Sequence, residues 1–174
     1  MSARSFIDSL DFARNGREMD GEMAIADLPR LQDVLESPQG TLKYVLRGAL
    51  DKQGGPMLEV SIDGVCRLRC QRCLGGMDHP VRIETRLVLH DQASLDVLES
   101  GQLLAGHPDG EAEYDSILAD SHLDVQELLE EEILLSLPIA PRHEPGACQA
   151  AEGGNLPKEK KHPFAVLSKL KAVE

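Results

Sequence analysis

The chain has 174 residues and a formal net charge of −12, and 41% of its residues are hydrophobic, yet it contains no Trp, two Tyr and three Phe. This length suits one domain with tails, and its core must be largely aliphatic. The acidic balance argues against bulk nonspecific binding to nucleic acid, because nucleic-acid phosphates attract positive charge.

Neither a membrane anchor nor a secretion signal is expected. No apolar run approaches the roughly 18 residues of a membrane-spanning helix. The acids Asp8 and Asp11 near the N-terminus are foreign to a signal peptide. We therefore expect a cytoplasmic protein without a membrane partner, whose four cysteines are thiols or metal ligands rather than disulfides.

Charge is distributed unevenly along the chain. Residues 96–132 contain twelve acids and no Lys or Arg, whereas residues 41–89 contain eight basic and five acidic residues. The sequence therefore predicts one acidic half and one mildly basic half, which leaves room for a local basic surface.

A short strand and a helix are predicted in the N-terminal part. Apolar and small residues alternate with polar ones from residue 19 to 25, which predicts the strand. Asp27 suits a helix N-cap and Pro29 suits a first helical turn, so a helix is expected that ends at residues 37–40. Its apolar face would consist of Leu28, Leu31, Val34 and Leu35.

Three further strands are predicted over residues 42–51, 58–69 and 81–89, because apolar and polar residues alternate in each of them. Short Gly-rich connections join them, which is typical of an antiparallel meander with one buried and one exposed face. Helices are the natural cover for the buried face.

The strongest helix signal follows the meander. Residues 91–110 form a polar connection with some helical potential, and residues 111–119 allow another short strand. Asp124 and Glu127 then match a capping box that opens a helix ending near Leu137. We expect this helix to pack on the sheet through its apolar residues.

Two further segments, one acidic and one in the C-terminal tail, are candidates for binding a partner. The acids Glu130 to Glu132 are interpreted as a solvent-facing helix surface, or as a dock for a basic partner such as a ribosomal protein. In the tail, apolar residues fall at helical spacing within residues 163–171. These residues are Phe164, Leu167 and Leu170. So short a segment is expected to fold only against its own domain or a partner.

Together these patterns predict an α+β fold. It consists of an antiparallel β-sheet, with a barrel-like closure as one option, that is covered by helices and followed by an irregular C-terminal tail. The expected organisation is a single α+β domain over residues 1–139 and a tail over residues 140–174 that contains the amphipathic segment 163–171.

Cys70 and Cys73 have the spacing of a metal-binding turn between two predicted strands. His143 and Cys148 are the best further ligands, because the loop that holds them contains Pro and Gly and lets both face one point. These four residues are the candidate zinc site, and free thiols are the alternative. A redox pair is disfavoured because no helix N-terminus follows Cys73. Cys66 should face the core and bind no metal.

Basic residues line the predicted exposed face of the meander. The candidate contacts to RNA phosphate or to a partner are Arg67, Arg69, Arg72, Arg82 and Arg86. The alternative is a solvated face with cross-strand charge pairs, because acids are interleaved with these arginines. No nucleophile elbow and no phosphate-binding Gly loop is recognisable, so no catalytic residues are predicted.

Several motifs in a fixed order carry a family resemblance. The matching segments are Cys70–Leu74, Leu123–Pro138, Pro141–His143 with Cys148, and His162–Lys171, with a looser match at Ile7–Asp8 and Phe12–Arg14. In this order and spacing the chain resembles the YceD family, the large ribosomal RNA subunit accumulation proteins of bacteria and plastids. It departs from some relatives, which have a richer cysteine cluster after the long helix.

The resemblance implies a non-enzymatic ribosome-biogenesis factor that supports the synthesis, processing or stability, and so the accumulation, of 23S ribosomal RNA. Its expected partners are pre-ribosomal large-subunit RNA or a basic ribosomal protein, and no small-molecule substrate is expected. The alternatives are a zinc-stabilised nucleic-acid-binding regulator and a protein adaptor.

Overall fold

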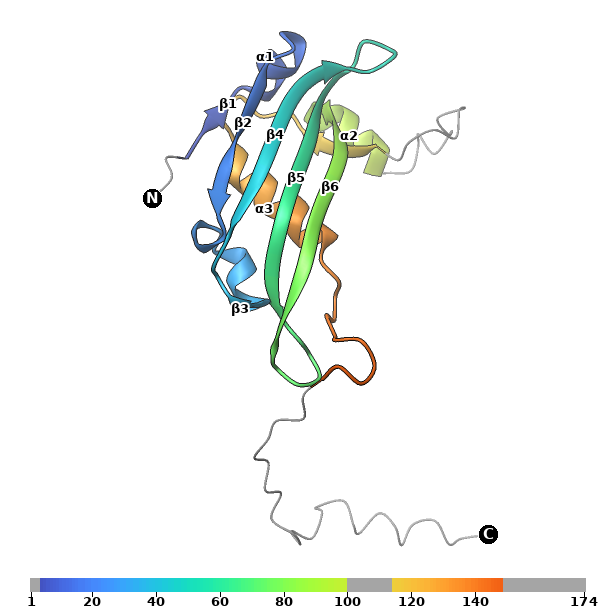
Figure 1. Cartoon of the computed structure of the whole chain (residues 1–174). Helices are drawn as coiled ribbons and strands as arrows, with labels where there is room; N and C mark the ends of the chain where they lie inside the picture. Colours follow the sequence, from blue (N-terminus) through green and yellow to red (C-terminus); the bar gives the residue numbers. More distant parts are fainter. Residues whose placement is uncertain (1–3, 100–113, 149–174) are drawn as a thin grey trace, which may run out of the picture.

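A computed structural model describes residues 4–99 and 114–148 (Figure 1). The strands are β1 (Phe6–Ile7), β2 (Glu18–Ala24), β3 (Leu35–Ser37), β4 (Thr41–Leu50), β5 (Pro56–Arg69), β6 (Gly76–His90), β7 (Asp115–Leu118) and β8 (Leu123–Asp124). The helices are α1 (Ser9–Arg14), α2 (Gln92–Glu99) and α3 (Val125–Ser136), with the 3-10 turns η1 (Ile25–Asp27) and η2 (Arg30–Asp33). The predicted segment 163–171 lies outside the described residues.

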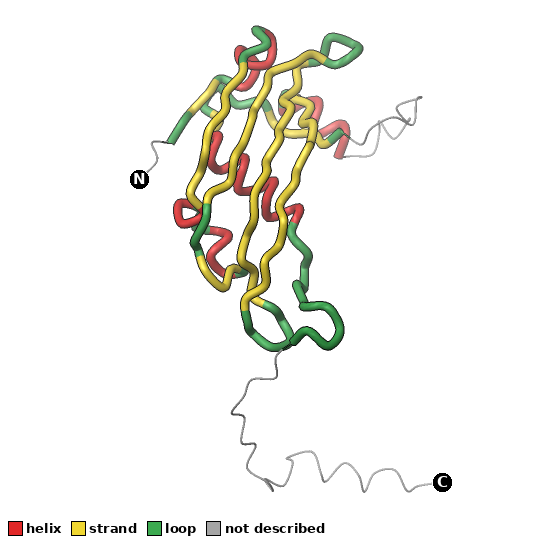
Figure 2. The backbone as a smooth tube through the Cα atoms, in the orientation of Figure 1, coloured by secondary structure: helices red, strands yellow, loops and turns green. Residues whose placement is uncertain are grey.

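The main sheet has the strand order β2-β4-β5-β6-β7, and β3 pairs with β5 beside this path. The neighbours from β2 to β6 are antiparallel, whereas β7 joins β6 in parallel. The β5–β6 ladder continues to the pair Arg69–Gly76 and makes the long hairpin seen in Figure 2. These pairings confirm the predicted α+β class and its antiparallel meander. With β2 and β7 as edges, the sheet of the described residues is open rather than barrel-like.

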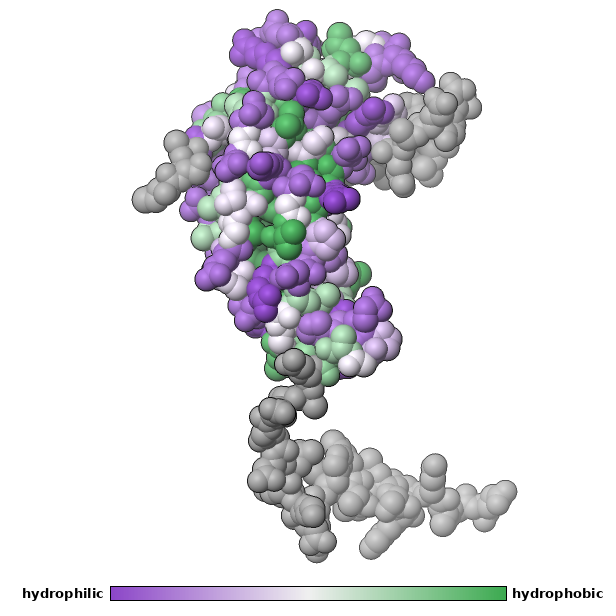
Figure 3. Space-filling view, viewed as in Figure 1, coloured by the Kyte–Doolittle hydropathy of each residue, from purple (hydrophilic) through white to green (hydrophobic). Residues whose placement is uncertain are grey.

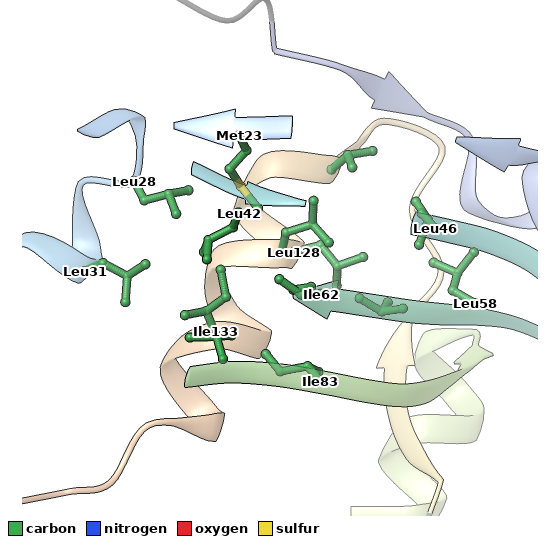
Figure 4. Packing of buried hydrophobic residues seen from close by; sticks show 14 of the residues in the cluster. Met23, Leu28, Leu31, Leu42, Leu46, Leu58, Ile62, Ile83, Leu128 and Ile133 are labelled. Atoms are coloured by element: carbon green, nitrogen blue, oxygen red, sulfur yellow. The ribbon is translucent and has the colours of Figure 1, made fainter. Parts of the chain in front are cut away.

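Helix α3 lies across one face of the sheet and closes the core (Figures 1 and 4). The inward-facing strand residues pack there against α3, and the largest fully buried side chains include Leu42, Leu46, Leu58, Ile62, Leu87, Leu129 and Ile133. Burial of each such side chain contributes about 2 kcal/mol, so this contact holds the helix on the sheet. The opposite face is turned toward the viewer in Figure 1, with no described helix in front of it.

Helix α3 begins where the sequence predicts it. The Asp124 residue is extended, and its carboxylate accepts hydrogen bonds from the backbone N–H groups of Gln126 (2.9 Å) and Glu127 (3.3 Å). Two of the free N–H groups in the first turn are thereby satisfied, as an N-cap requires.

The helix predicted to follow Asp27 is wrong. This stretch instead forms η1, η2 and the short strand β3, and Leu35 pairs with Leu68 of β5. The cause lies far away in the sequence, because the Glu130 carboxylate accepts hydrogen bonds from the backbone N–H groups of Arg30 (2.6 Å) and Leu31 (3.2 Å). An acid on α3 thus caps η2, and pairing with β5 replaces the expected last helical turns.

Helix α1 packs close to β4 at Gly48. A Cβ atom at this position would overlap the backbone of Phe12 and Ala13, so the close approach of helix and strand requires glycine. Two weaker predictions are also confirmed: α2 occupies part of the stretch with helical potential, and β7 is the short strand expected before the long helix.

Candidate metal centre

The Cys70–Gly75 turn joins β5 to β6 at the far end of the long hairpin. The backbone N–H of Leu74 donates to the Cys70 carbonyl (2.9 Å), and the N–H of Cys70 donates to the Gly75 carbonyl (2.9 Å). Leu74 has a φ of 61°, in the left-handed region that non-glycine residues rarely adopt. This tight turn brings Cys70 and Cys73 to the same side of the hairpin end.

The segment 141–148, which follows α3, returns to this turn (Figure 1). The backbone N–H of Gln71 donates to the Pro141 carbonyl (2.8 Å), which fixes the start of the segment. The guanidinium of Arg72 donates to the backbone carbonyls of His143 and Glu144 (3.4 Å each). These contacts bring two parts of the chain that are about seventy residues apart into one cluster.

Four side chains meet in this cluster with the spacing of a tetrahedral metal site. The Sγ atoms of Cys70 and Cys148 are 3.7 Å apart, and Nδ1 of His143 is 3.4 Å from Sγ of Cys73 and 3.6 Å from Sγ of Cys148. Zinc–sulfur bonds of about 2.3 Å in a tetrahedron place two sulfurs about 3.8 Å apart. All four ligand atoms lie within 4.8 Å of one another, so the cluster could bind a metal. The structure thus brings together the four residues that the sequence grouped.

The imidazole of His143 is oriented as metal-binding histidines are. Its Nε2 lies 3.1 Å from the Gly76 carbonyl oxygen, and Nδ1 faces the sulfurs. When Nε2–H donates to this carbonyl, neutral imidazole carries no proton on Nδ1, which is then free to coordinate. A backbone carbonyl in this position is a common partner of a ligating histidine.

The thiols in the cluster oppose one another's ionisation. Burial disfavours the Cys70 thiolate, but backbone hydrogen bonds from Cys73 and His143 outweigh this effect and lower the Cys70 pKa to about 5. A backbone hydrogen bond from Gly75 favours the Cys73 thiolate, but burial and the neighbouring thiols outweigh it and raise the Cys73 pKa. A bound cation removes this conflict, because coordination deprotonates each thiol. The chemistry of the donor set therefore fits zinc.

Arg72 belongs to this cluster rather than to the sheet face. Its Nε–H donates to Sγ of Cys148 (3.0 Å), and this hydrogen bond raises the pKa of the guanidinium. A hydrogen bond to a ligating sulfur is one way in which surrounding residues stabilise a metal thiolate. Sequence reasoning placed Arg72 with the arginines of the sheet face because strand alternation does not give the direction of a side chain within the turn.

Cys66 lies apart from the cluster, as predicted. It is fully buried on the inner face of β5, and desolvation raises the pKa of its thiol to about 11. Such a thiol behaves as a small core side chain and stays protonated near neutral pH.

The outward face of β4, β5 and β6 carries the other candidate basic residues. The ion pairs there are Lys43–Glu22 (3.9 Å), Arg47–Glu18 (2.8 Å), Arg82–Asp63 (3.7 Å), Arg86–Glu59 (3.2 Å) and Arg67 with both Glu36 (2.8 Å) and Asp78 (3.0 Å). Three of these acids, Glu18, Glu22 and Glu36, lie in β2 and β3. They precede residues 41–89, the stretch from which a basic half was predicted. Figure 3 accordingly shows hydrophilic and hydrophobic residues mixed over this face. RNA contact through Arg67, Arg82 and Arg86 stays a prediction.

Two arginines near the metal cluster have no acidic partner in the described part of the chain. The guanidinium of Arg69 donates to the Leu35 carbonyl (3.2 Å), and Arg142 is exposed beside the cluster. The hairpin end therefore carries two exposed guanidinium groups that no acid of the described residues neutralises.

The acids at the centre of α3 are not the solvent-facing surface that the sequence indicated. Glu130 is only 3% exposed, and its carboxylate binds the N–H groups that open η2. Glu132 is only 8% exposed, while Glu131 is exposed and pairs with Arg30 (2.8 Å). The other predicted partner-binding residues, Phe164, Leu167 and Leu170, lie outside the described residues.

Residues 58–171 match the family described as "Large ribosomal RNA subunit accumulation protein YceD". The chain belongs to the YceD family. The match includes all four cluster residues, and it confirms the resemblance drawn from the sequence motifs. The family name implies a role in the accumulation of large-subunit ribosomal RNA, and it does not describe an enzyme.

No solved structure matches the chain at a significant level. Among the described residues, no helix has the length and apolar character that crossing a membrane requires.

Proposed function

We propose that this YceD-family chain is a non-enzymatic factor that supports accumulation of 23S ribosomal RNA, with a structural zinc site formed by Cys70, Cys73, His143 and Cys148. The supporting observation is the convergence of these four ligand atoms within 4.8 Å, from two distant segments of a chain that matches the family. A bound zinc ion would supply charge neutralisation and a fixed tetrahedral geometry.

In this proposal the cluster positions the beginning of the tail. Cys70 and Cys73 belong to the β5–β6 turn, while His143 and Cys148 belong to the segment after α3. Joint coordination therefore links the hairpin end to the point where the tail leaves the domain. Arg72 reinforces the link through its hydrogen bonds to this segment.

We further propose that the hairpin end is the RNA-contacting surface. Arg69 and Arg142 flank the cluster without acidic partners in the described part of the chain, whereas Arg82 and Arg86 pair with acids on neighbouring strands. An unpaired guanidinium can neutralise a phosphate without first losing an ion pair, so it gains more from the contact.

Two double variants with the same change in net charge test this surface. The variant Arg69→Glu/Arg142→Glu should lower the ratio of 23S to 16S ribosomal RNA in cells and release the protein from large-subunit precursors in sucrose gradients. The matched control Arg82→Glu/Arg86→Glu should change neither readout. The reverse result would assign RNA contact to the sheet face, and an unchanged ratio in cells lacking the protein would refute the proposed function.

Metal analysis of the purified protein tests the site itself. We expect one zinc per chain, lost in Cys73→Ser and retained in Cys66→Ser, because Cys66 lies in the core. A protein purified without chelators that contains no zinc, and that takes up none when zinc is added, would refute the site.

The adaptor alternative differs in what holds the protein on precursor particles. Direct RNA contact predicts release by ribonuclease treatment of captured complexes. Retention of ribosomal proteins after complete RNA digestion would favour the adaptor.

A further inference from the structure

An acidic groove lies between α3 and the segment that contains β7 and β8. Its volume is about 690 Å³. Phe6, Leu118 and Leu135 contribute apolar surface, and Leu135 is 72% exposed. The acids along this groove are Asp115, Asp120, Asp124, Glu127, Glu131 and Glu132. Exposed apolar side chains beside carboxylates form a surface suited to a basic amphipathic peptide.

Part of this acidic lining has no cation within the described residues. Asp124 and Glu131 have arginine partners, whereas Asp115, Glu127 and Glu132 form no ion pair there. Glu132 is more than nine-tenths buried, receives no hydrogen bond from the described residues, and has Asp115 and Glu131 as negative neighbours. Because no fully buried side-chain oxygen of the described residues lacks a hydrogen bond, the Glu132 carboxylate reaches the groove surface, where a cation could contact it. Repulsion by Asp115 and Glu131 makes such a contact favourable.

The chain itself contains a segment with the complementary chemistry. Residues 158–171 hold five lysines and a single acid. Phe164 and Leu167 fall on one face of a helix, and Lys171 follows Leu167 by four residues, which places its charge on the same face. Such a short helix is not stable alone in water and needs a surface to cover its apolar side.

The connecting chain is long enough to reach the groove. Cys148 lies beside the hairpin end, and Leu87 of β6 lies in the groove. The strand from Gly76 to Leu87 spans about 36 Å at about 3.3 Å per residue. Between Cys148 and Phe164 the extended chain covers about 50 Å. Attachment also keeps the segment at a high effective concentration near the groove.

We propose that residues 158–171 dock into this groove of their own chain, with Phe164, Leu167 and Leu170 on the exposed leucines and with lysines beside Asp115, Glu127 and Glu132. The proposal goes beyond the proposed function and does not depend on it. In the free protein the docked segment covers the groove and neutralises its acids.

Zero-length carbodiimide crosslinking of the purified full chain tests the docking, because it joins only amines and carboxylates in contact. A mixture of ¹⁴N- and ¹⁵N-labelled protein separates links within one chain from links between two. We expect links from Lys169 or Lys171 to Asp115, Glu127 or Glu131 within single chains. Mixed-isotope links would mean that a second copy occupies the groove, and the absence of these links would leave it for another partner; either result overturns the proposal.

Substitutions in the segment show whether apolar docking, and not charge alone, creates these links. The variant Leu167→Ser/Leu170→Ser keeps every lysine and should reduce the links several-fold. The control Ala165→Ser changes an apolar residue on the opposite face of the helix and should leave them unchanged. Equal yields in the leucine variant and the parent would contradict a docked helix.

A double-mutant cycle gives an independent readout. Glu132→Gln should raise the midpoint of urea unfolding in the Lys169→Gln/Lys171→Gln background, because it removes a charge that Asp115 and Glu131 repel. In the parent chain the same substitution should give no such rise, because a lysine already compensates this charge. The same shift in both backgrounds would show that the lysines do not reach Glu132.

Discussion

At the scale of single residues, the four cysteines should fall into two classes of reactivity. Cys66 and Cys70 are fully buried, and Cys66 has a thiol pKa of about 11, whereas Cys73 and Cys148 are partly exposed in the candidate metal cluster. Iodoacetamide should therefore modify none of them in the zinc-loaded protein, and after chelation it should modify Cys73 and Cys148 first, because burial still shields Cys66 and Cys70. Mass spectrometry of the modified chain measures this. Early labelling of Cys66 would contradict the packing of β5.

A second residue prediction concerns Glu130. Its carboxylate satisfies the backbone N–H groups of Arg30 and Leu31, so Glu130→Ala leaves one partly buried and one buried donor without an acceptor. We expect a loss of about 2 kcal/mol in the free energy of unfolding, and a smaller loss for Glu130→Gln, which keeps an acceptor oxygen. Urea titration measures both variants, with Glu84→Ala on the exposed sheet face as the control. Equal effects of Glu130→Ala and Glu84→Ala would exclude the capping role.

At the scale of elements, metal coordination should couple the β5–β6 turn to the segment after α3. Cys148→Ser removes one ligand, so hydrogen exchange should speed up both in residues 141–148 and in the turn at residues 70–75. The core of β5 and β6 should keep its protection, because α3 still covers it. Faster exchange in one of the two segments alone would show that they are not held by a common metal.

Local patterns predicted the elements whose neighbours in space are also neighbours in sequence. Alternation located β4, β5 and β6, because each pairs with the next along the chain. Asp124 located the start of α3, because a cap acts on residues two and three positions away. The four residues of the candidate metal cluster are the exception, since about seventy residues separate Cys73 from His143. Ligand chemistry grouped them, because zinc requires four N or S ligands and His143 and Cys148 are the best further candidates.

The remaining features depend on contacts between distant segments. The stretch after Asp27 has helical periodicity, but Glu130 and β5 stabilise turns and a strand there instead. Residues 41–89 contain more bases than acids, which predicted a basic sheet face. In the structure, however, β2 and β3 place acids beside Arg47 and Arg67. No pattern within either segment encodes these partners, so sequence reasoning misjudged both local structure and surface charge.

At the scale of the whole molecule, acidic and basic side chains are concentrated on different surfaces. The sheet face alternates acids and bases, and the groove beside α3 is acidic. At the hairpin end, Arg69 and Arg142 have no acidic partner among the described residues. The chain has a net charge of −12, so it and the negatively charged RNA repel each other over long distances. Binding therefore requires close contact at one local basic surface. Docking of the basic segment 158–171 in the groove would also make its lysines inaccessible to RNA.

This arrangement predicts a shallow salt dependence of RNA binding. If the hairpin end supplies Arg69 and Arg142, two phosphate contacts give a slope of log K against log salt of about −1.5 to −2. Filter binding to a 23S ribosomal RNA fragment captured by crosslinking measures this slope. In the groove variant Asp115→Asn/Glu127→Gln the slope should steepen, because undocked lysines become free to contact phosphate. A parent slope of about −5 or steeper would instead mean that the sheet face or the lysines already bind RNA in the unaltered chain.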